Sequence, residues 1–170
     1  GRNLSVEQFG TFGALFAIFY IASIFSNSLQ AGIAEVIART KSSYDTNVAL
    51  TTGLILIGQV ALMATLITIA FAIFQNQIRH VFNIESTHIT LMVVLSIFFA
   101  LTISAPTGVF QGLQHFAAFS LFAQVIPQTA KLILGTIMIS SGDKLFGAIA
   151  SIPISGAFAL TLSLIWVSRL

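Results

Sequence analysis

The sequence lacks cysteine and has very little charge. The absence of cysteine excludes disulfide bonds, thiolate nucleophiles and cysteine-based metal sites. Asp, Glu, Lys and Arg together make up 7% of the 170 residues, against about 25% in a typical soluble domain. None of them occurs between Ser86 and Ala130. A bilayer requires uncharged chain of this kind, because its hydrocarbon core of roughly 30 Å takes about 20 mostly apolar residues to cross as a helix. These absences indicate a membrane protein.

The motifs of common enzyme classes are also missing. There is no glycine-rich phosphate loop, no Gly-x-Ser-x-Gly and no pair of acidic residues within an apolar stretch. His80, His88 and His115 are not accompanied by carboxylates at ligand spacing. A nucleic-acid surface would require clustered basic residues, and the seven in this sequence are scattered. We therefore expect no enzyme activity, no metal or other cofactor, and no nucleic-acid partner.

Hydrophobic residues account for 56% of the chain, and the mean hydropathy is +0.99. Charges and turn residues divide the sequence into five apolar stretches, each long enough to span a bilayer with some tilt. Only helices satisfy their own backbone groups in lipid, and the stretches lack the alternation of barrel strands. The sequence therefore predicts an all-α, polytopic bundle of a multi-pass membrane protein. Within one transmembrane domain (residues 1–170), the expected spans are about 9–29, 48–74, 89–110, 116–140 and 145–168.

The links between the expected spans are short and polar, so none holds a soluble domain. Lys and Arg in short loops normally set the orientation of a membrane protein. Here the two sides receive three each, which leaves the absolute orientation open. An odd number of spans places the termini on opposite sides, and no leader peptide is recognisable, so we expect a fragment of a longer chain. One side receives Arg39, Lys41 and Arg169, and the other receives Arg2, Arg79 and Lys144.

The fourth stretch carries the clearest candidate site. Ser120, Gln124, Gln128 and Lys131 follow at intervals of four, four and three residues, which places them on one face of a regular helix. Pro127 lies in the same stretch and has no N–H to donate to the preceding turn. A lysine deep in a span is rare and marks a candidate functional site. One interpretation is a transport cavity whose ammonium binds an anionic substrate. The other is a lysine that extends to the interface or bonds to nearby amides and carbonyls.

The end of the first stretch is a second candidate. Asn27 and Gln30 are three residues apart and share one helical face, where they could contact substrate. The alternative is an ordinary helix end at the membrane interface, because the stretch becomes polar ahead of Gly32. Glu35 and Arg39 then follow at the four-residue spacing of a helical ion pair.

Small residues recur at every fourth position of the last stretch, at Gly147, Ser151, Ser155 and Ala159. Lipid provides no hydrophobic force between helices, so small residues that permit close approach favour helix association. We expect this ridge to serve packing rather than chemistry.

Four segments resemble the polysaccharide-biosynthesis (Wzx-type) flippases, within the multidrug/oligosaccharidyl-lipid/polysaccharide exporter superfamily. Residues 4–12 (LSVEQFGTF) are similar to the loop after that family's first helix. Residues 108–116 (GVFQGLQHF) resemble its turn between helices four and five. Residues 131–135 (KLILG), followed by Gly142 and by residues 146–150 (FGAIA), resemble its fifth helix and the entry to its sixth.

The resemblance implies the first six-helix lobe of an alternating-access transporter without its opening helix, with the second lobe absent. It implies a cell (inner or plasma) membrane location, with Arg39 and Lys41 in a cytoplasmic loop and residues 79–85 outside. It also implies an isoprenoid-pyrophosphate-linked oligosaccharide as substrate, besides contact with the lipid bilayer. Such an anionic substrate fits Lys131, the one deeply placed cation of the sequence.

Two other functions stay open at this level. A multidrug exporter of the same superfamily would favour a carboxylate within a span, and no expected span contains Asp or Glu. A non-transporting membrane scaffold would use Lys131 only to pair with a partner helix.

Overall fold

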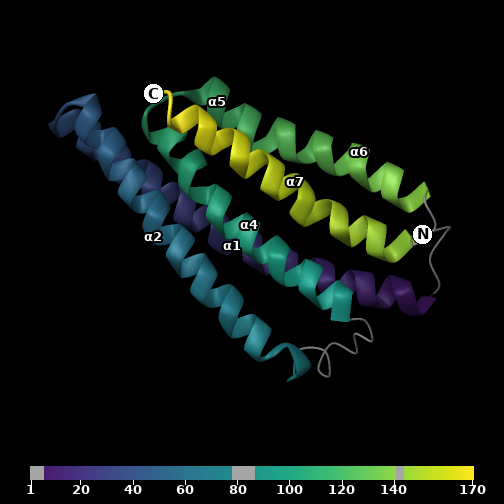
Figure 1. The fold of residues 1–170 in the computed structure, drawn as a ribbon. Coiled ribbons are helices and arrows are strands. Elements are labelled where there is room, and N and C mark those ends of the chain that lie inside the picture. Colours follow the sequence, from purple (N-terminus) through teal and green to yellow (C-terminus); the bar gives the residue numbers. More distant parts are fainter. Residues whose placement is uncertain (1–5, 78–86, 141–143) are drawn as a thin grey trace.

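The computed structural model describes residues 6–77, 87–140 and 144–170. Within these ranges the chain is an all-α bundle, as the sequence predicts, and Figure 1 shows its long helices lying side by side. Five of the described helical stretches are long and apolar enough to cross a membrane.

The bounds of the helices agree with the expected spans except at the first. The fourth span is built from three consecutive segments: a short α-helix, a π-helical turn and a longer α-helix. The elements are α1 (Val6–Ser43), α2 (Thr46–Ile73), α4 (Thr87–Gly112), α5 (Phe116–Ser120), the π-helix η1 (Leu121–Val125), α6 (Ile126–Ser140) and α7 (Lys144–Val167).

Helix α1 continues well beyond the expected end at residue 29, so the interpretation of Asn27 and Gln30 as part of a helix end is wrong. Its 38 residues correspond to roughly 57 Å at about 1.5 Å per residue, more than a hydrocarbon core needs. The polar residues near Asn27 do not stop the helix, because part of them bond within it or to α4. Farther along, Arg39 pairs with Glu35, as the spacing predicts.

The connection from α1 to α2 is correspondingly tight. Only Tyr44 and Asp45 separate the two helices, and the Asp45 carboxylate accepts a hydrogen bond of 2.6 Å from the backbone N–H of Thr46. Asp45 is the N-cap residue of α2, and this bond satisfies a backbone donor of the first turn that has no partner within the helix. Nearby, the Lys41 ammonium donates to the carbonyl of Leu113 at 3.0 Å, which ties this end of α1 to the end of α4.

Helix α4 is the centre of the bundle. It packs against α1, α2 and α7, whereas α6 packs mainly on α7. Figure 1 shows the same order, with α2 on one flank and α6 on the other. The buried side chains include Ala105, Val109 and Phe110 of α4, together with Ile37 of α1. Helices α1 and α6 are thus held by different neighbours, α1 mainly by α4 and α6 mainly by α7.

Glycines set the closest helix contacts. A Cβ atom at Gly108 would lie 2.8 Å from the carbonyl oxygen of Gln30, and one at Gly112 would lie 2.6 Å from the Cβ of Ile37. These two glycines, four residues apart, therefore let α4 approach α1 in the manner of a GxxxG contact. A Cβ at Gly147 would lie 2.8 Å from the backbone of Met138, so the predicted small-residue ridge does take part in packing against α6.

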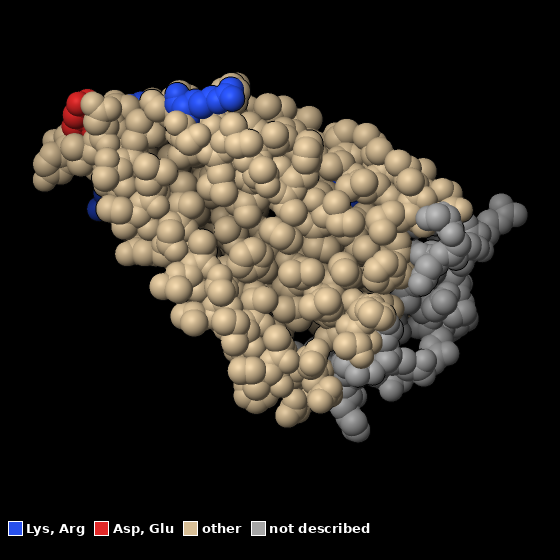
Figure 2. All heavy atoms as spheres, in the orientation of Figure 1, with Lys and Arg blue, Asp and Glu red and all other residues tan. Residues whose placement is uncertain are grey.

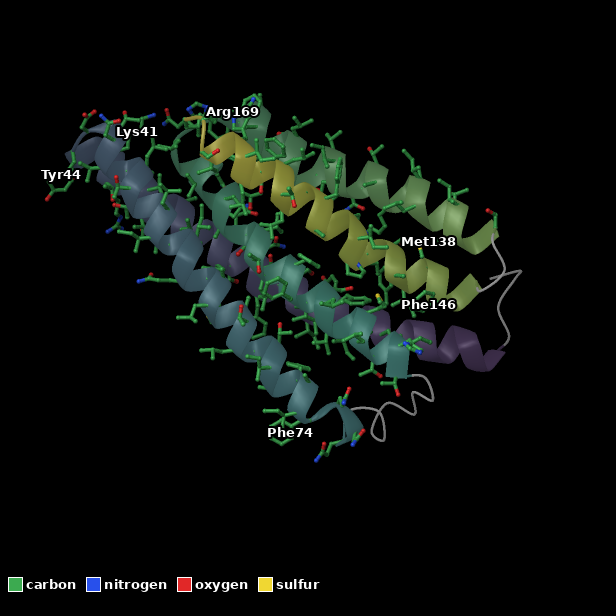
Figure 3. All side chains as sticks on the ribbon, viewed as in Figure 1. Lys41, Tyr44, Phe74, Met138, Phe146 and Arg169 are labelled. Atoms are coloured by element: carbon green, nitrogen blue, oxygen red, sulfur yellow. The ribbon has the colours of Figure 1, made fainter. Side chains whose placement is uncertain are left out.

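Labelled side chains mark the two ends of the bundle. Figure 3 shows Lys41, Tyr44 and Arg169 at one end, and Phe74, Met138 and Phe146 at the other. Among the described residues, the charged side chains visible in Figure 2 include a group at the first of these ends, and the flank is almost free of them. Residues 79–85 and Asp143, which the sequence places at the second end, lie outside the described residues.

We expect the two ends of the bundle to lie on opposite sides of the membrane. An impermeant thiol reagent should therefore label Ser43→Cys and Gln77→Cys from opposite sides, with no background because the chain has no cysteine. Gln114→Cys should follow the first variant, and Ser140→Cys the second. Labelling of Ser43→Cys and Gln77→Cys from the same side would contradict a bundle of five spans.

The contact between α1 and α4 should tolerate no added side-chain atom. Gly112→Ala should lower the unfolding temperature, because overpacking costs about 1–3 kcal/mol. Gly58→Ala is the matched control: no atom lies within 4 Å of a Cβ built there, and alanine favours the helix by about 1 kcal/mol. Thermal unfolding in detergent measures both. Equal unfolding temperatures for the two variants would show that the α1–α4 contact is not limiting.

Candidate functional site

A cavity of about 400 Å³ lies between α1, α4, α7 and the segment formed by η1 and α6. It falls within the range of about 300–1,000 Å³ that is common for small-molecule sites. Four of the predicted site residues line it: Asn27 from α1, Gln124 from η1, and Gln128 and Lys131 from α6. The two candidate segments of the sequence, one in the first apolar stretch and one in the fourth, therefore both contribute residues to a single cavity.

The π-helical turn decides which polar residues face the cavity. In η1, the N–H of Ile126 bonds to the carbonyl of Leu121, five residues back. Such turns insert one extra residue into a helix and are frequent at functional sites. Pro127 follows directly and has no N–H with which to resume the regular pattern. The segment before η1 is therefore rotated relative to the segment after it by about one residue, or roughly 100°.

Ser120 is the predicted site residue that this rotation removes. The four-residue spacing from Ser120 to Gln124 places both on one face only if the helix is regular. In the structure Ser120 is exposed and is not among the residues that line the cavity. The structure therefore does not bring Ser120 together with the other predicted site residues.

Gln30 also lies outside the lining of the cavity. Its amide donates to the side-chain oxygen of Gln111 at 3.1 Å, and its own oxygen accepts from Thr107 at 3.3 Å. Gln30 thus joins α1 to α4 next to the Gly108 contact. The sequence could not show these contacts, because the partners of Gln30 lie about 80 residues away.

Several further residues, which were not predicted from the sequence, also line the cavity. Phe16, Tyr20 and Ser23 precede Asn27 on α1 at intervals of four, three and four residues. This is the spacing of one helical face, so the pattern was available in the sequence. The remaining unpredicted lining residues come from α1, α4, η1, α6 and α7 and include Phe19, Ser26, Ser96, Phe99, Ala123 and Ser155.

The serines of the cavity are already engaged. Ser23, Ser96 and Ser155 donate to carbonyls of their own helices at 2.7, 2.7 and 2.8 Å. Ser26 instead donates across to the carbonyl of Ala100 on α4 at 2.6 Å. Their hydroxyl protons are therefore not available to a ligand.

Five other polar side chains of the lining are uncommitted. Among the described residues, none of these five makes a hydrogen bond or an ion pair. In hydrocarbon a polar group without a partner is costly, so groups of this kind face water, a ligand or protein. They comprise one ammonium, three amides and one phenol: Lys131, Asn27, Gln124, Gln128 and Tyr20.

The chemistry of this set is specific. Amides and a phenol both donate and accept hydrogen bonds, whereas an ammonium only donates. No Asp or Glu is among the lining residues, so the cavity carries one positive charge and no negative one. In the described part of the chain no three His, Asp or Glu residues are grouped so as to hold a metal ion. The arrangement therefore suits an organic ligand with an anionic group and several hydroxyls.

Comparisons with known proteins provide no relative from which to transfer a function. No family model, curated protein or solved structure matches the chain.

We expect the cavity to be filled with water when no ligand is bound. Gln128→Cys should then react with a water-soluble thiol reagent about tenfold faster than Thr129→Cys, because residue 129 is exposed on the outer face of α6, where lipid would raise the pKa of a thiol and suppress the reactive thiolate. The two positions are adjacent on α6, but residue 129 lines an outer hollow with residues such as Ile133 and Phe158. Equal rates at both positions would mean that the cavity is not hydrated.

Proposed function

We propose that this chain forms part of a membrane transporter that flips lipid-linked oligosaccharide for surface polysaccharide biosynthesis by alternating access. The single observation that carries the proposal is the intramembrane cavity in which Lys131 meets four other uncommitted polar side chains. In this proposal the protein is a multi-pass protein of the cell (inner or plasma) membrane and is not an enzyme.

The isolated cation is the first argument for an anionic substrate. A charged side chain at membrane depth is costly and is retained where it serves a substrate, an ion or a partner charge. Lys131 is half-buried in the cavity, and no carboxylate among the lining residues neutralises it. A pyrophosphate would supply the missing negative charge, and a lysine binds phosphate as a point charge.

The amides are the second argument, for a substrate that carries hydroxyls. Each of Asn27, Gln124 and Gln128 offers two donors and one acceptor oxygen. A sugar hydroxyl both donates and accepts, so it complements an amide in either direction. The resemblance of four segments to Wzx-type flippases supports the same combination of sugar and pyrophosphate, joined through an isoprenoid lipid.

The two alternatives fit the cavity less well. A multidrug exporter for cationic drugs would need a carboxylate at the site, and the lining contains none. In the described residues, Glu35 of α1 and Asp45 between α1 and α2 are exposed and do not line the cavity. A scaffold would use Lys131 as a contact for a partner helix, which leaves the three amides at the same cavity unexplained.

Substitution of Lys131 tests the proposal. In cells that depend on this protein, Lys131→Met should reduce polysaccharide export at least about tenfold at unchanged membrane levels, because the charge that binds pyrophosphate is lost. Lys131→Arg should keep part of the activity, since the charge survives although its geometry differs. Export is measured as surface polysaccharide per cell, and membrane level by quantitative blotting. Normal export by the Lys131→Met variant would refute a role of this charge in transport.

A further inference from the structure

A second hollow of about 360 Å³, here called the recess, adjoins the cavity on the side nearer the connection between α6 and α7. The cavity and this recess share Gln128, Lys131 and Ile152, and also Phe16 of α1, in their linings. From these shared residues the recess continues between α6 and α7. Lys131 is therefore placed in the wall that the two adjoining spaces share.

The recess differs from the cavity in polarity. Beyond Lys131 it is lined by Leu132, Gly135, Ala148 and Ile152, besides two hydroxyl residues. Thr136 donates to the carbonyl of Leu132 at 2.7 Å, and Ser151 donates to the carbonyl of Ala148 at 2.8 Å. The hydroxyl protons of the recess are thus engaged, whereas the cavity on the other side of Lys131 presents free amides. The lining therefore becomes less polar from Asn27 in the cavity, past Lys131, to Gly135 in the recess.

We propose that the recess holds the first part of the hydrocarbon chain of the same ligand whose anionic group binds Lys131. This inference rests on the proposed function and adds the direction in which the ligand lies. The hydrophilic head lies toward Asn27 and Gln124, the phosphate at Lys131, and the chain along α6 and α7 toward Gly135. A ligand with these three parts in this order is an alkyl or isoprenoid lipid with an anionic, hydroxylated head.

The wall that the two spaces share favours a lipid chain over a docked helix. A helix seated in the recess would cover the shared wall at Gln128 and Lys131, and would deny them either water or ligand. A hydrocarbon chain that joins a phosphate at Lys131 leaves these polar groups accessible from the cavity. Because the surroundings are already apolar, the chain gains little by transfer. Its effect is to hold the phosphate in register with the ammonium.

Filling the recess tests the inference. A Cβ at Gly135 would lie 3.4 Å from the hydroxyl of Ser151, an ordinary contact, and the rest of a leucine side chain would occupy the recess. We therefore compare Gly135→Leu with Ala130→Leu, which adds the same side chain on the outer hollow of α6. Two probes are titrated against the protein in nanodiscs: a polyprenyl pyrophosphate-linked sugar, and the chain-free methyl ester of the same sugar pyrophosphate.

Gly135→Leu should weaken binding of the chain-linked probe by about tenfold, or about 1.4 kcal/mol, and leave the chain-free probe unchanged. Ala130→Leu should affect neither probe. Unchanged affinity of Gly135→Leu for the chain-linked probe, or an equal loss for both probes, would overturn the inference. Two other results would contradict the proposed function itself. One is that Lys131→Met binds both probes as tightly as the unaltered protein. The other is that the unaltered protein binds neither probe.

A second measurement does not depend on the folding of a variant. A photoreactive diazirine on the first isoprene unit of the chain-linked probe should crosslink the unaltered protein at Leu132, Thr136 or Ala148. Crosslinks confined to the outer hollow, at Ala130 or Phe158, would place the chain elsewhere and refute the recess as its site.

Discussion

The close approach of α4 to α1 is the contact on which the rest of the bundle depends. Gly108 and Gly112 leave no room for a side-chain atom against residues 30–37 of α1. This contact fixes the rotation of α1 about its own axis, and the hydrogen bond from Gln30 to Gln111 holds it there. With one face of α1 against α4, the face that carries Tyr20 and Asn27 is directed to the cavity. In a bilayer such packing replaces the hydrophobic force of a soluble core.

Much of the fold followed from the scarcity of charge alone. Apolar stretches of more than 20 residues have one stable backbone conformation in lipid, so the helices and most of their bounds could be predicted. The first helix end could not, because a run of polar residues signals the interface only when their side chains lack partners in the bundle. Here Ser26 bonds to the carbonyl of Ala100, a partner that no local pattern reveals.

The candidate site was predictable in part for the same reason. Periodicity placed Gln124, Gln128 and Lys131 correctly, because these residues occupy the helix from η1 onward. It misplaced Ser120, which precedes the extra residue of the π-helical turn, and nothing in the spacing announces that turn. It also grouped Gln30 with Asn27. The Gln30 amide is engaged by α4 and the Asn27 amide is free, and only the contact with α4 distinguishes them. Local spacing thus locates a face, whereas tertiary partners decide which of its polar groups remain available.

The π-helical turn that displaces Ser120 from the predicted face also accounts for the cavity. Before and within the turn, α5 and η1 pack against α4. After it, α6 packs on α7 and, within the described residues, has no comparable contact with α4. The helix therefore leaves the centre of the bundle at the point where η1 and Pro127 interrupt its hydrogen bonds. Space opens in front of Gln124, Gln128 and Lys131 for that reason, so the irregular turn both rotates the polar face and creates the volume into which that face projects.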